Sequence, residues 1–85
     1  MKIFYRSRFK REFKKLPKKI QDLAEEKIEI FRKNPFDSRL DTHKLHGLLK
    51  TFWAFSVDYK NRIIFDFCDK YTIRFYSIGD HDIYW

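Results

Sequence analysis

Three histidines are the residues of this sequence best suited to transfer protons. His43 and His46 stand three positions apart in the middle of the chain, and His81 stands near its end. An unperturbed imidazole has a pKa of about 6.5, so both of its forms are populated near neutral pH and it can act as an acid or a base. Without other information, histidines in a small basic protein are usually surface residues. His43 and His46 could also suggest a metal pair, but a metal site needs further ligands and no cysteine lies near them, so we expect no metal.

Positive charge is concentrated at one end of the chain. Residues 1–19 contain nine lysines and arginines against Glu12 alone, a balance of +8, whereas residues 20–85 balance to −1. A field of this kind attracts polyanions, so nucleic acid is the leading class of partner. Two other interpretations stay open: the basic run is a solvated helix face, or an acidic protein covers it.

The elements that must position these residues can be predicted from the spacing of apolar residues. Alternation over residues 2–5 predicts a first strand, which Ser7 ends by capping a helix. Apolar residues at helical spacing predict that helix up to Pro17, where a second helix begins that Pro35 stops. Residues 35–50 are the least regular stretch and are expected to form a loop or a short strand.

The C-terminal part of the chain is rich in residues that favour strands. Three strands are expected at residues 52–58, 62–68 and 71–78, and the short turns between them require antiparallel pairing. On the last strand apolar and polar residues alternate, so helices can cover one face of the sheet and leave the other face for a ligand. The expected fold is α+β, with two N-terminal helices packed on a small, mostly antiparallel sheet of about four strands.

Aromatic residues supply the core of this small chain. Ten phenylalanines, five tyrosines and two tryptophans compensate for the limited surface that a single domain, residues 1–85, can bury. No apolar run reaches the ~20 residues of a transmembrane helix. The single cysteine cannot form an internal disulfide and no N-terminal segment resembles a signal peptide, so we expect a soluble, cytoplasmic protein. The residues expected in the core are Phe9, Phe13, Phe31, Trp53, Phe65, Phe75 and Cys68.

Four stretches of the sequence carry a family resemblance through their order and spacing. They are residues 9–17 (FKREFKKLP), 43–47 (HKLHG), 62–65 (RIIF) and 78–82 (IGDHD), followed by Trp85. Nearly the whole chain resembles the RelE/ParE toxins, and most closely the YafQ-like branch of ribosome-associated mRNA endonucleases. The resemblance implies a toxin of a type II toxin–antitoxin system, which enters the ribosomal A site and inhibits translation by cutting mRNA without a metal ion or other cofactor.

The resemblance also implies roles for individual residues. His43 matches the histidine of the H-x-L-x-G motif and His81 that of the G-x-H motif, and both matched positions are catalytic in the YafQ-like branch. Trp85 falls where relatives usually carry Phe or Tyr. Four other positions depart from the family pattern, so at least one proton-transfer or phosphate-binding group is replaced or missing. Ser56 stands in place of a histidine, Lys60 of a catalytic aspartate, Ser77 of an arginine and Ala54 of a basic residue.

Metal-independent RNA cleavage requires a base, an acid and a cation, because the ribose 2′-OH must attack the neighbouring phosphate. We assign His81 as acid or base, His43 as the complementary group, and Arg62 as the phosphate clamp. Lys44 and Lys50 are the alternatives to Arg62 as the clamp.

Other residues are expected to bind RNA, and some of them could have a purely structural role instead. Arg62 could instead pair with Asp58 or Asp66 across a turn. Trp85 is expected to stack on a base, although a terminal aromatic could also fill the core. The basic helix is expected to contribute Lys10, Arg11 and Lys14 to RNA binding.

Two other functions are compatible with the family resemblance. A ParE-like inhibitor of DNA gyrase shares the fold and needs no catalytic histidine, but such relatives usually lack both histidine motifs. A degenerate, non-toxic member acting as a binding module would explain the four departures from the pattern. In every case the resemblance implies an antitoxin that wraps around the chain and covers its basic face, with a toxin–antitoxin heterotetramer as an expected assembly and no membrane contact.

Overall fold

The computed structural model describes residues 1–80 of the chain, apart from the side chain of Leu48. His81 and Trp85, and with them the roles predicted for these residues, lie outside the described residues. No helix within residues 1–80 is long and apolar enough to cross a membrane. The elements in chain order are β1 (Lys2–Tyr5), α1 (Ser7–Lys15), α2 (Lys18–Lys33), the 3₁₀ helix η1 (Ser38–Leu40), β2 (His43–Lys44), the 3₁₀ helix η2 (Gly47–Leu49), β3 (Trp53–Ser56), β4 (Arg62–Asp69) and β5 (Thr72–Gly79).

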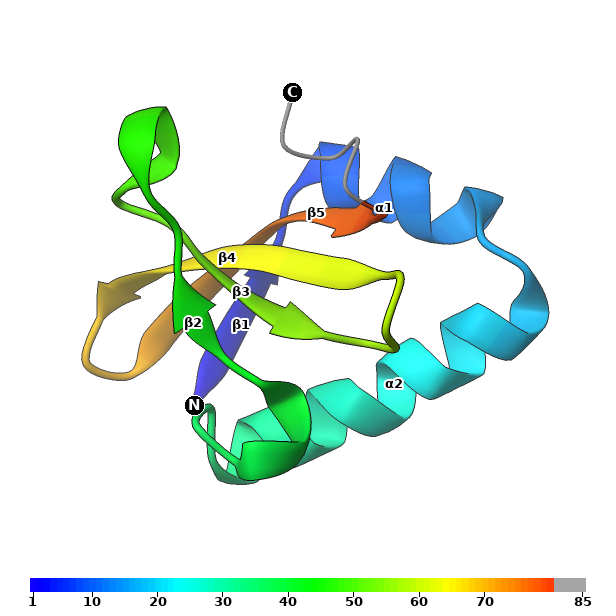
Figure 1. Ribbon diagram of the computed structural model, residues 1–85, viewed down its shortest axis with the longest axis horizontal. Coiled ribbons are helices and arrows are strands. Elements are labelled where there is room, and N and C mark those ends of the chain that lie inside the picture. Colours follow the sequence, from blue (N-terminus) through cyan, green and yellow to red (C-terminus); the bar gives the residue numbers. More distant parts are fainter. Residues whose placement is uncertain (81–85) are drawn as a thin grey trace.

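The strands form a five-stranded sheet in the order β1-β5-β4-β3-β2 (Figure 1). Strands β3, β4 and β5 form the predicted antiparallel meander, and β2 joins β3 antiparallel at one edge. Strand β1 pairs parallel with β5 at the other edge. The α+β fold with two helices on a mostly antiparallel sheet is therefore confirmed. The sheet has one strand more than expected, because β2 has only two residues and so offers no visible alternation in the sequence.

Pro17 separates the two helices as predicted, and a glutamine completes their junction. The last carbonyl groups of an α-helix have no partners within the helix. Gln21 of α2 supplies a hydrogen-bond donor at the end of α1. Its Nε2 donates to the carbonyl oxygen of Phe13 at 2.9 Å and to that of Leu16 at 3.1 Å. The two helices are thus held to each other at their joint.

The predicted cap at the start of α1 was wrong. Arg6 occupies the N-cap position, Ser7 is already the first helical residue, and no side chain caps this end. The reason lies in the sheet, because the backbone N–H of Arg6 donates to the carbonyl oxygen of Phe75 at 3.0 Å. The hydrogen-bonded ladder of β1 and β5 therefore continues to Arg6, and the chain turns into the helix directly after it.

The helices cover one face of the sheet, and this interface is the main core (Figure 1). At its centre Phe31 of α2 is fully buried and stacks on Phe55, with 4.7 Å between ring centroids. Phe65 and Phe75 contact the same ring edge-on, at 4.9 and 5.5 Å. The strand residues come from β3, β4 and β5, so one phenylalanine of α2 joins the three central strands.

Most of the predicted core residues occupy the core, with one error. Phe9 is buried with the phenylalanines just described, and Phe13 and Trp53 are partly buried against the same cluster. Cys68 was expected in the core but is exposed. It follows Phe67, which is paired with the core residue Ile73, so alternation along β4 turns Cys68 to the face away from the helices.

Candidate functional site

The face of the sheet away from the helices, called here the open face, carries charged, polar and aromatic side chains. Residues directly opposite each other on paired strands share a face. The register places His43 opposite Ala54, Ala54 opposite Ile64, and Ser56 opposite Arg62. Ala54 and Ile64 form a small second cluster with Leu45, separate from the main core. The described residues of the open face include His43, Phe52, Ala54, Ser56, Arg62, Ile64, Asp66, Arg74 and Tyr76.

His43 stands at the edge of the open face, with one ring nitrogen occupied. The side chain is exposed, and its Nδ1 lies 2.9 Å from the carbonyl oxygen of Asp41. A carbonyl oxygen only accepts hydrogen bonds, so Nδ1 carries the proton in this contact. In the neutral ring the lone pair is then on Nε2, which is the nitrogen that can take a proton from a ligand.

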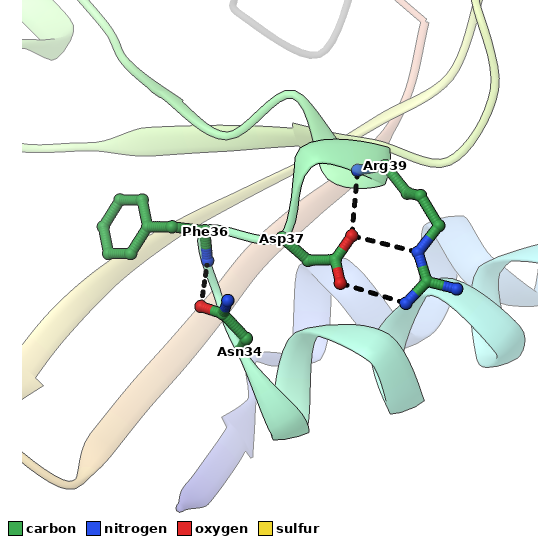
Figure 2. A network of polar contacts seen from close by, with 4 residues as sticks. All are labelled: Asn34, Phe36, Asp37 and Arg39. Carbon is green, nitrogen blue, oxygen red and sulfur yellow. Dashed lines mark hydrogen bonds and ion pairs between the residues drawn. The ribbon is translucent and has the colours of Figure 1, made fainter.

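The loop before β2, which leads to Asp41, contains two short polar networks (Figure 2). Asn34 Oδ1 accepts from the N–H of Phe36 at 3.0 Å. Asp37 Oδ1 accepts from the N–H of Arg39 at 2.9 Å and from its Nε at 3.0 Å, and Oδ2 pairs with Nη2 at 3.0 Å. The Arg39 guanidinium and backbone N–H lower the pKa of Asp37 to about 2. Asp41, which follows η1, has a left-handed backbone with φ 51°, so it turns its carbonyl towards the histidine ring.

Arg62 lies at the start of β4, directly opposite Ser56 on one side and Gly79 on the other. Its Nη1 donates to the carbonyl oxygen of Tyr59 at 3.3 Å, and within residues 1–80 no carboxylate pairs with it. Gly79, the last residue of β5, thus lies beside Arg62.

The two ion pairs considered for Arg62 are not formed. The carboxylate of Asp58 accepts from the backbone N–H groups of Lys60 and Asn61, at 2.9 and 2.6 Å, and closes its own turn. These hydrogen bonds lower the pKa of Asp58 although its burial acts in the opposite direction. Asp66 instead binds Arg74 of β5 with two contacts, of 3.2 and 2.9 Å. Neither carboxylate considered as a partner of Arg62 therefore neutralises its guanidinium.

His43 and Arg62 lie on the same face, two strands and two residues apart. With strands about 4.8 Å apart and a rise of about 3.3 Å per residue, their Cα atoms are separated by about 12 Å. Long side chains from both positions can reach a group bound between them. The arrangement combines a proton acceptor and a cation on one exposed surface, which are two of the three groups needed to cleave a phosphodiester.

His46 does not join this arrangement. It is exposed at the N-cap of η2, and its side chain makes no capping hydrogen bond. Among the residues that the structure describes, no group of three histidine, cysteine or acidic side chains is placed to hold a metal ion. His46 therefore offers a control for any experiment on His43.

The predicted lysines divide between different surfaces. Lys44 is paired with Trp53, whose ring packs against the main core, so Lys44 lies on the face opposite to His43. Lys50 follows η2 and is exposed. Lys10 and Lys14 line an apolar groove between α1 and α2, whereas Arg11 faces a different cavity beside Tyr76. Lys44, the predicted alternative to Arg62 as phosphate clamp, is thus placed by the register on the other face of the sheet.

The departures from the family pattern have structural counterparts. Ala54 is fully buried in the second cluster, so a long basic side chain would not fit at this position without displacing its neighbours. Ser77 is also buried, and its Oγ donates to Glu12 Oε1 of α1 at 2.6 Å. The same oxygen accepts from the N–H of Ile78 at 3.3 Å. Glu12 therefore ties α1 to the end of β5 at the place where relatives are expected to carry an arginine.

Two aromatic residues of the open face were not among the predicted site residues. Tyr76 of β5 and Phe52, just before β3, meet edge-on with 4.7 Å between ring centroids, and both are only partly buried. The guanidinium groups of Arg6 and Arg74 lie over the Tyr76 ring, at 5.5 and 5.6 Å from its centroid. The alternation of Arg74 and Tyr76 with buried residues along β5 is the signal in the sequence from which this cluster could have been found.

Comparison with solved structures shows which fold this is. YafQ from Escherichia coli superposes with a TM-score of 0.80 at 20% identity, over 98% of this chain and 96% of that one. A YoeB/ParE toxin from Agrobacterium tumefaciens gives a TM-score of 0.79 at 12% identity, over 95% and 99% of the two chains. The heterotetrameric YoeB-YefM toxin–antitoxin complex from Staphylococcus aureus gives 0.77 at 16% identity, over 95% and 97%. No protein-family model and no curated protein matches the sequence. The chain therefore has the RelE/ParE-like toxin fold, as the sequence resemblance predicted.

Proposed function

We propose that this chain is the toxin of a type II toxin–antitoxin pair and that it cuts mRNA at its open face without a metal ion. The observation that supports this most directly is the placement of His43 and Arg62 on one exposed face, with Nε2 of the histidine as proton acceptor and the arginine without a carboxylate partner in residues 1–80. The fold shared with YafQ supports the same assignment. In this proposal the chain cuts mRNA in the ribosomal A site, in the cytoplasm.

In this mechanism Nε2 of His43 takes the proton of the ribose 2′-OH. The oxygen attacks the adjacent phosphorus and forms a 2′,3′-cyclic phosphate, while the bond to the 5′ oxygen of the next nucleotide breaks. That oxygen takes its proton from the second histidine, His81, whose role is inferred from the resemblance because it lies outside the described residues. Arg62 stabilises the negative charge that develops on the phosphoryl oxygens.

The surface around these residues fits single-stranded RNA. Unstacked bases bind to aromatic rings, at about 1–3 kcal/mol for each stacked base. Phe52 and Tyr76 lie in the middle of the open face and are partly exposed. An RNA strand crossing the sheet would thus meet aromatic rings between its contacts with cationic side chains.

An antitoxin is the second partner in this proposal. An apolar groove of about 310 Å³ between the helices is lined by Phe9, Phe13 and Ile28, and its charged lining residues are Lys10, Lys14 and Glu25, with a net positive charge. An amphipathic, acidic segment would bury its apolar side chains there and pair its carboxylates with the lysines. The YoeB-YefM complex from Staphylococcus aureus is a heterotetramer, and we propose the same assembly here.

The proposal is tested by mapping transcript 5′ ends after brief induction of the parent chain, of His43→Ala and of the control His46→Ala. Losing the base is expected to slow cleavage by about 10²–10⁴-fold. The control should cut like the parent, because His46 is an exposed histidine three residues away with no capping contact.

Other outcomes would contradict the proposal in different ways. Cleavage by His43→Ala at the parent's rate would remove His43 from the mechanism. Intact transcripts together with inhibited DNA supercoiling would indicate a gyrase inhibitor. Normal growth at a high level of the parent chain would indicate a non-toxic binding module.

A further inference from the structure

A second concentration of positive charge lies where β1 passes into α1. A cavity of about 460 Å³ opens between this junction and Tyr76 of β5. It lies at the β1 edge of the sheet, whereas His43 stands at the β2 edge. We call it the arginine pocket, and its lining residues are Tyr5, Arg6, Ser7, Arg8, Arg11 and Tyr76.

One arginine of the pocket lies at the junction of β1 and α1, and the other two lie in α1. Arg6 ends the ladder with β5, and its guanidinium lies over the Tyr76 ring. Arg8 and Arg11 are three positions apart on α1, so they share one side of that helix. Arg8 pairs with Glu12 at 3.3 Å. Within residues 1–80 no carboxylate pairs with Arg6 or Arg11, so the pocket keeps an excess of positive charge.

The chemistry of the pocket suits a phosphate group. A guanidinium presents a planar fork of N–H donors that matches two oxygens of a phosphate, which an ammonium does not. The first turn of α1 has no side-chain cap and no acidic residue, so its positive end adds to the same field. No lining residue is acidic. A phosphodiester is therefore a better match than a neutral or cationic ligand.

The position of the pocket relates it to the proposed cleavage site. The register runs from His43 through Ala54 and Ile64 to Ser77, next to Tyr76. From β2 to β1 this row spans about 19 Å, since neighbouring strands are about 4.8 Å apart. The Phe52–Tyr76 pair lies along the way and connects to the pocket through the Arg6 guanidinium. An extended RNA strand can thus contact both ends of the row with several nucleotides between them.

We propose that Arg6, Arg8 and Arg11 form a backbone subsite, which binds one phosphodiester of the RNA strand several nucleotides away from the scissile phosphate. This inference rests on the proposed function and extends it from the cleavage site to the path of the substrate. The subsite anchors the strand across the open face without reading its bases, because guanidinium contacts to phosphate carry no sequence information. Tyr76 holds Arg6 in place and so acts as a positioning residue.

The test uses a fully 2′-O-methylated RNA oligonucleotide, which cannot be cleaved, and measures its dissociation constant by fluorescence anisotropy at several salt concentrations. The double variant Arg6→Gln/Arg11→Gln is expected to bind about tenfold more weakly. The slope of log K against log salt should fall by about 0.7, the value for one phosphate contact on a single strand. The matched control Lys19→Gln/Lys33→Gln removes the same charge from exposed positions of α2, which do not line the pocket, and should leave both quantities close to the parent's.

A conservative variant separates charge from geometry. Arg11→Lys keeps the charge and loses the fork, so it should bind more weakly than the parent and more tightly than Arg11→Gln. Equal losses in the pocket and control variants would show that only the overall field matters and would overturn the subsite. Unchanged RNA binding in Arg6→Gln/Arg11→Gln would also overturn the subsite. If this double variant kept its RNA affinity but lost its affinity for the antitoxin, the pocket would be a protein-binding site instead. Circular dichroism and thermal unfolding confirm that each variant is folded.

The outcome for the subsite is distinguishable from that for the cleavage proposal. If the parent chain cuts no RNA but its affinity depends on Arg6 and Arg11 as described, the subsite stands as an RNA-binding site and the catalytic proposal fails. If the parent cuts RNA and the double variant cuts with the same KM and kcat, the catalytic proposal stands and the subsite fails.

Discussion

The two faces of the sheet are made by the same strands and differ in what surrounds their side chains. On the helix side, Phe55, Phe65 and Phe75 are fully buried around Phe31. On the open face a small cluster around Ala54 and Ile64 is buried, and charged residues such as Arg62 and Arg74 flank it. One side of the sheet thus supplies the buried core, whereas the other side presents charged and aromatic side chains at the surface. Substitutions on the two sides should therefore have separable effects.

The largest effect on stability is expected on the helix side. Phe31→Ala removes the ring that contacts three strands and should lower the free energy of unfolding by about 3–5 kcal/mol. Urea denaturation measures this loss. Tyr59→Ala is the matched control, because that ring is 92% exposed and its removal should cost less than about 0.5 kcal/mol. Similar losses in both variants would mean that the helix side is not the dominant core.

A smaller effect is expected where α1 is joined to the end of β5. Glu12→Ala leaves the buried hydroxyl of Ser77 without its acceptor and should lower the free energy of unfolding by about 1–3 kcal/mol. Ser77→Ala removes the hydroxyl itself and leaves Glu12 with Arg8, so it should cost less than Glu12→Ala. The same urea measurement ranks the two variants. A reversed order would mean that the Glu12 side chain does not link the helix to the strand.

The smallest expected effect is a dependence of stability on pH that arises in the loop before His43. The pKa of Asp37 is lowered from 3.8 to about 2, first by the hydrogen bond from the Arg39 side chain and then by that from the Arg39 backbone. Because the pKa is lower in the folded chain, the stabilising contribution of Asp37 is complete above its ordinary pKa and is lost as the pH falls through about 2. An NMR titration of the Asp37 carboxyl carbon measures the midpoint directly.

Arg39→Ala is the variant that checks the cause of this pKa. The side-chain donors are lost, so the midpoint should move upward towards 3.8, while the backbone N–H of residue 39 keeps part of the shift. The loop that presents Asp41 to His43 should also lose order, seen as faster amide exchange in residues 36–41. A midpoint that stays near 2 would show that Arg39 does not determine it.

Much of the fold could be predicted because local features specify it. Pro17 and Pro35 mark the helix ends, since proline lacks the N–H that a helix interior requires. The short turns before β4 and β5 permit only antiparallel neighbours. Phe31 follows the apolar stripe of its helix and lies in the core as expected. In each case the interaction that decides the structure is made within a few residues of the chain.

The predictions that failed depended on where an element lies relative to the others. Cys68 looks like a core residue by type, yet its position next to Phe67, the partner of the core residue Ile73, turns it to the face away from the helices. Arg62 looked able to pair with Asp58 or Asp66, but each carboxylate is bound elsewhere, by its own turn or by Arg74. Ser7 was displaced as the cap because the β1–β5 ladder continues to Arg6. None of these alternatives can be ranked before the partners are placed in space.

The sequence by itself determined the α+β class, the approximate extent of the two helices, the meander and the presence of histidine and arginine side chains. Those properties follow from backbone propensity, periodicity and side-chain chemistry, which act locally. Only the tertiary structure decided that His43 and Arg62 share a face, that Lys44 lies on the other one, and that Arg6 joins Arg8 and Arg11 around one cavity. These facts depend on strand register and on the crossing of distant segments, because a shift of one residue would turn every side chain of a strand to the opposite face.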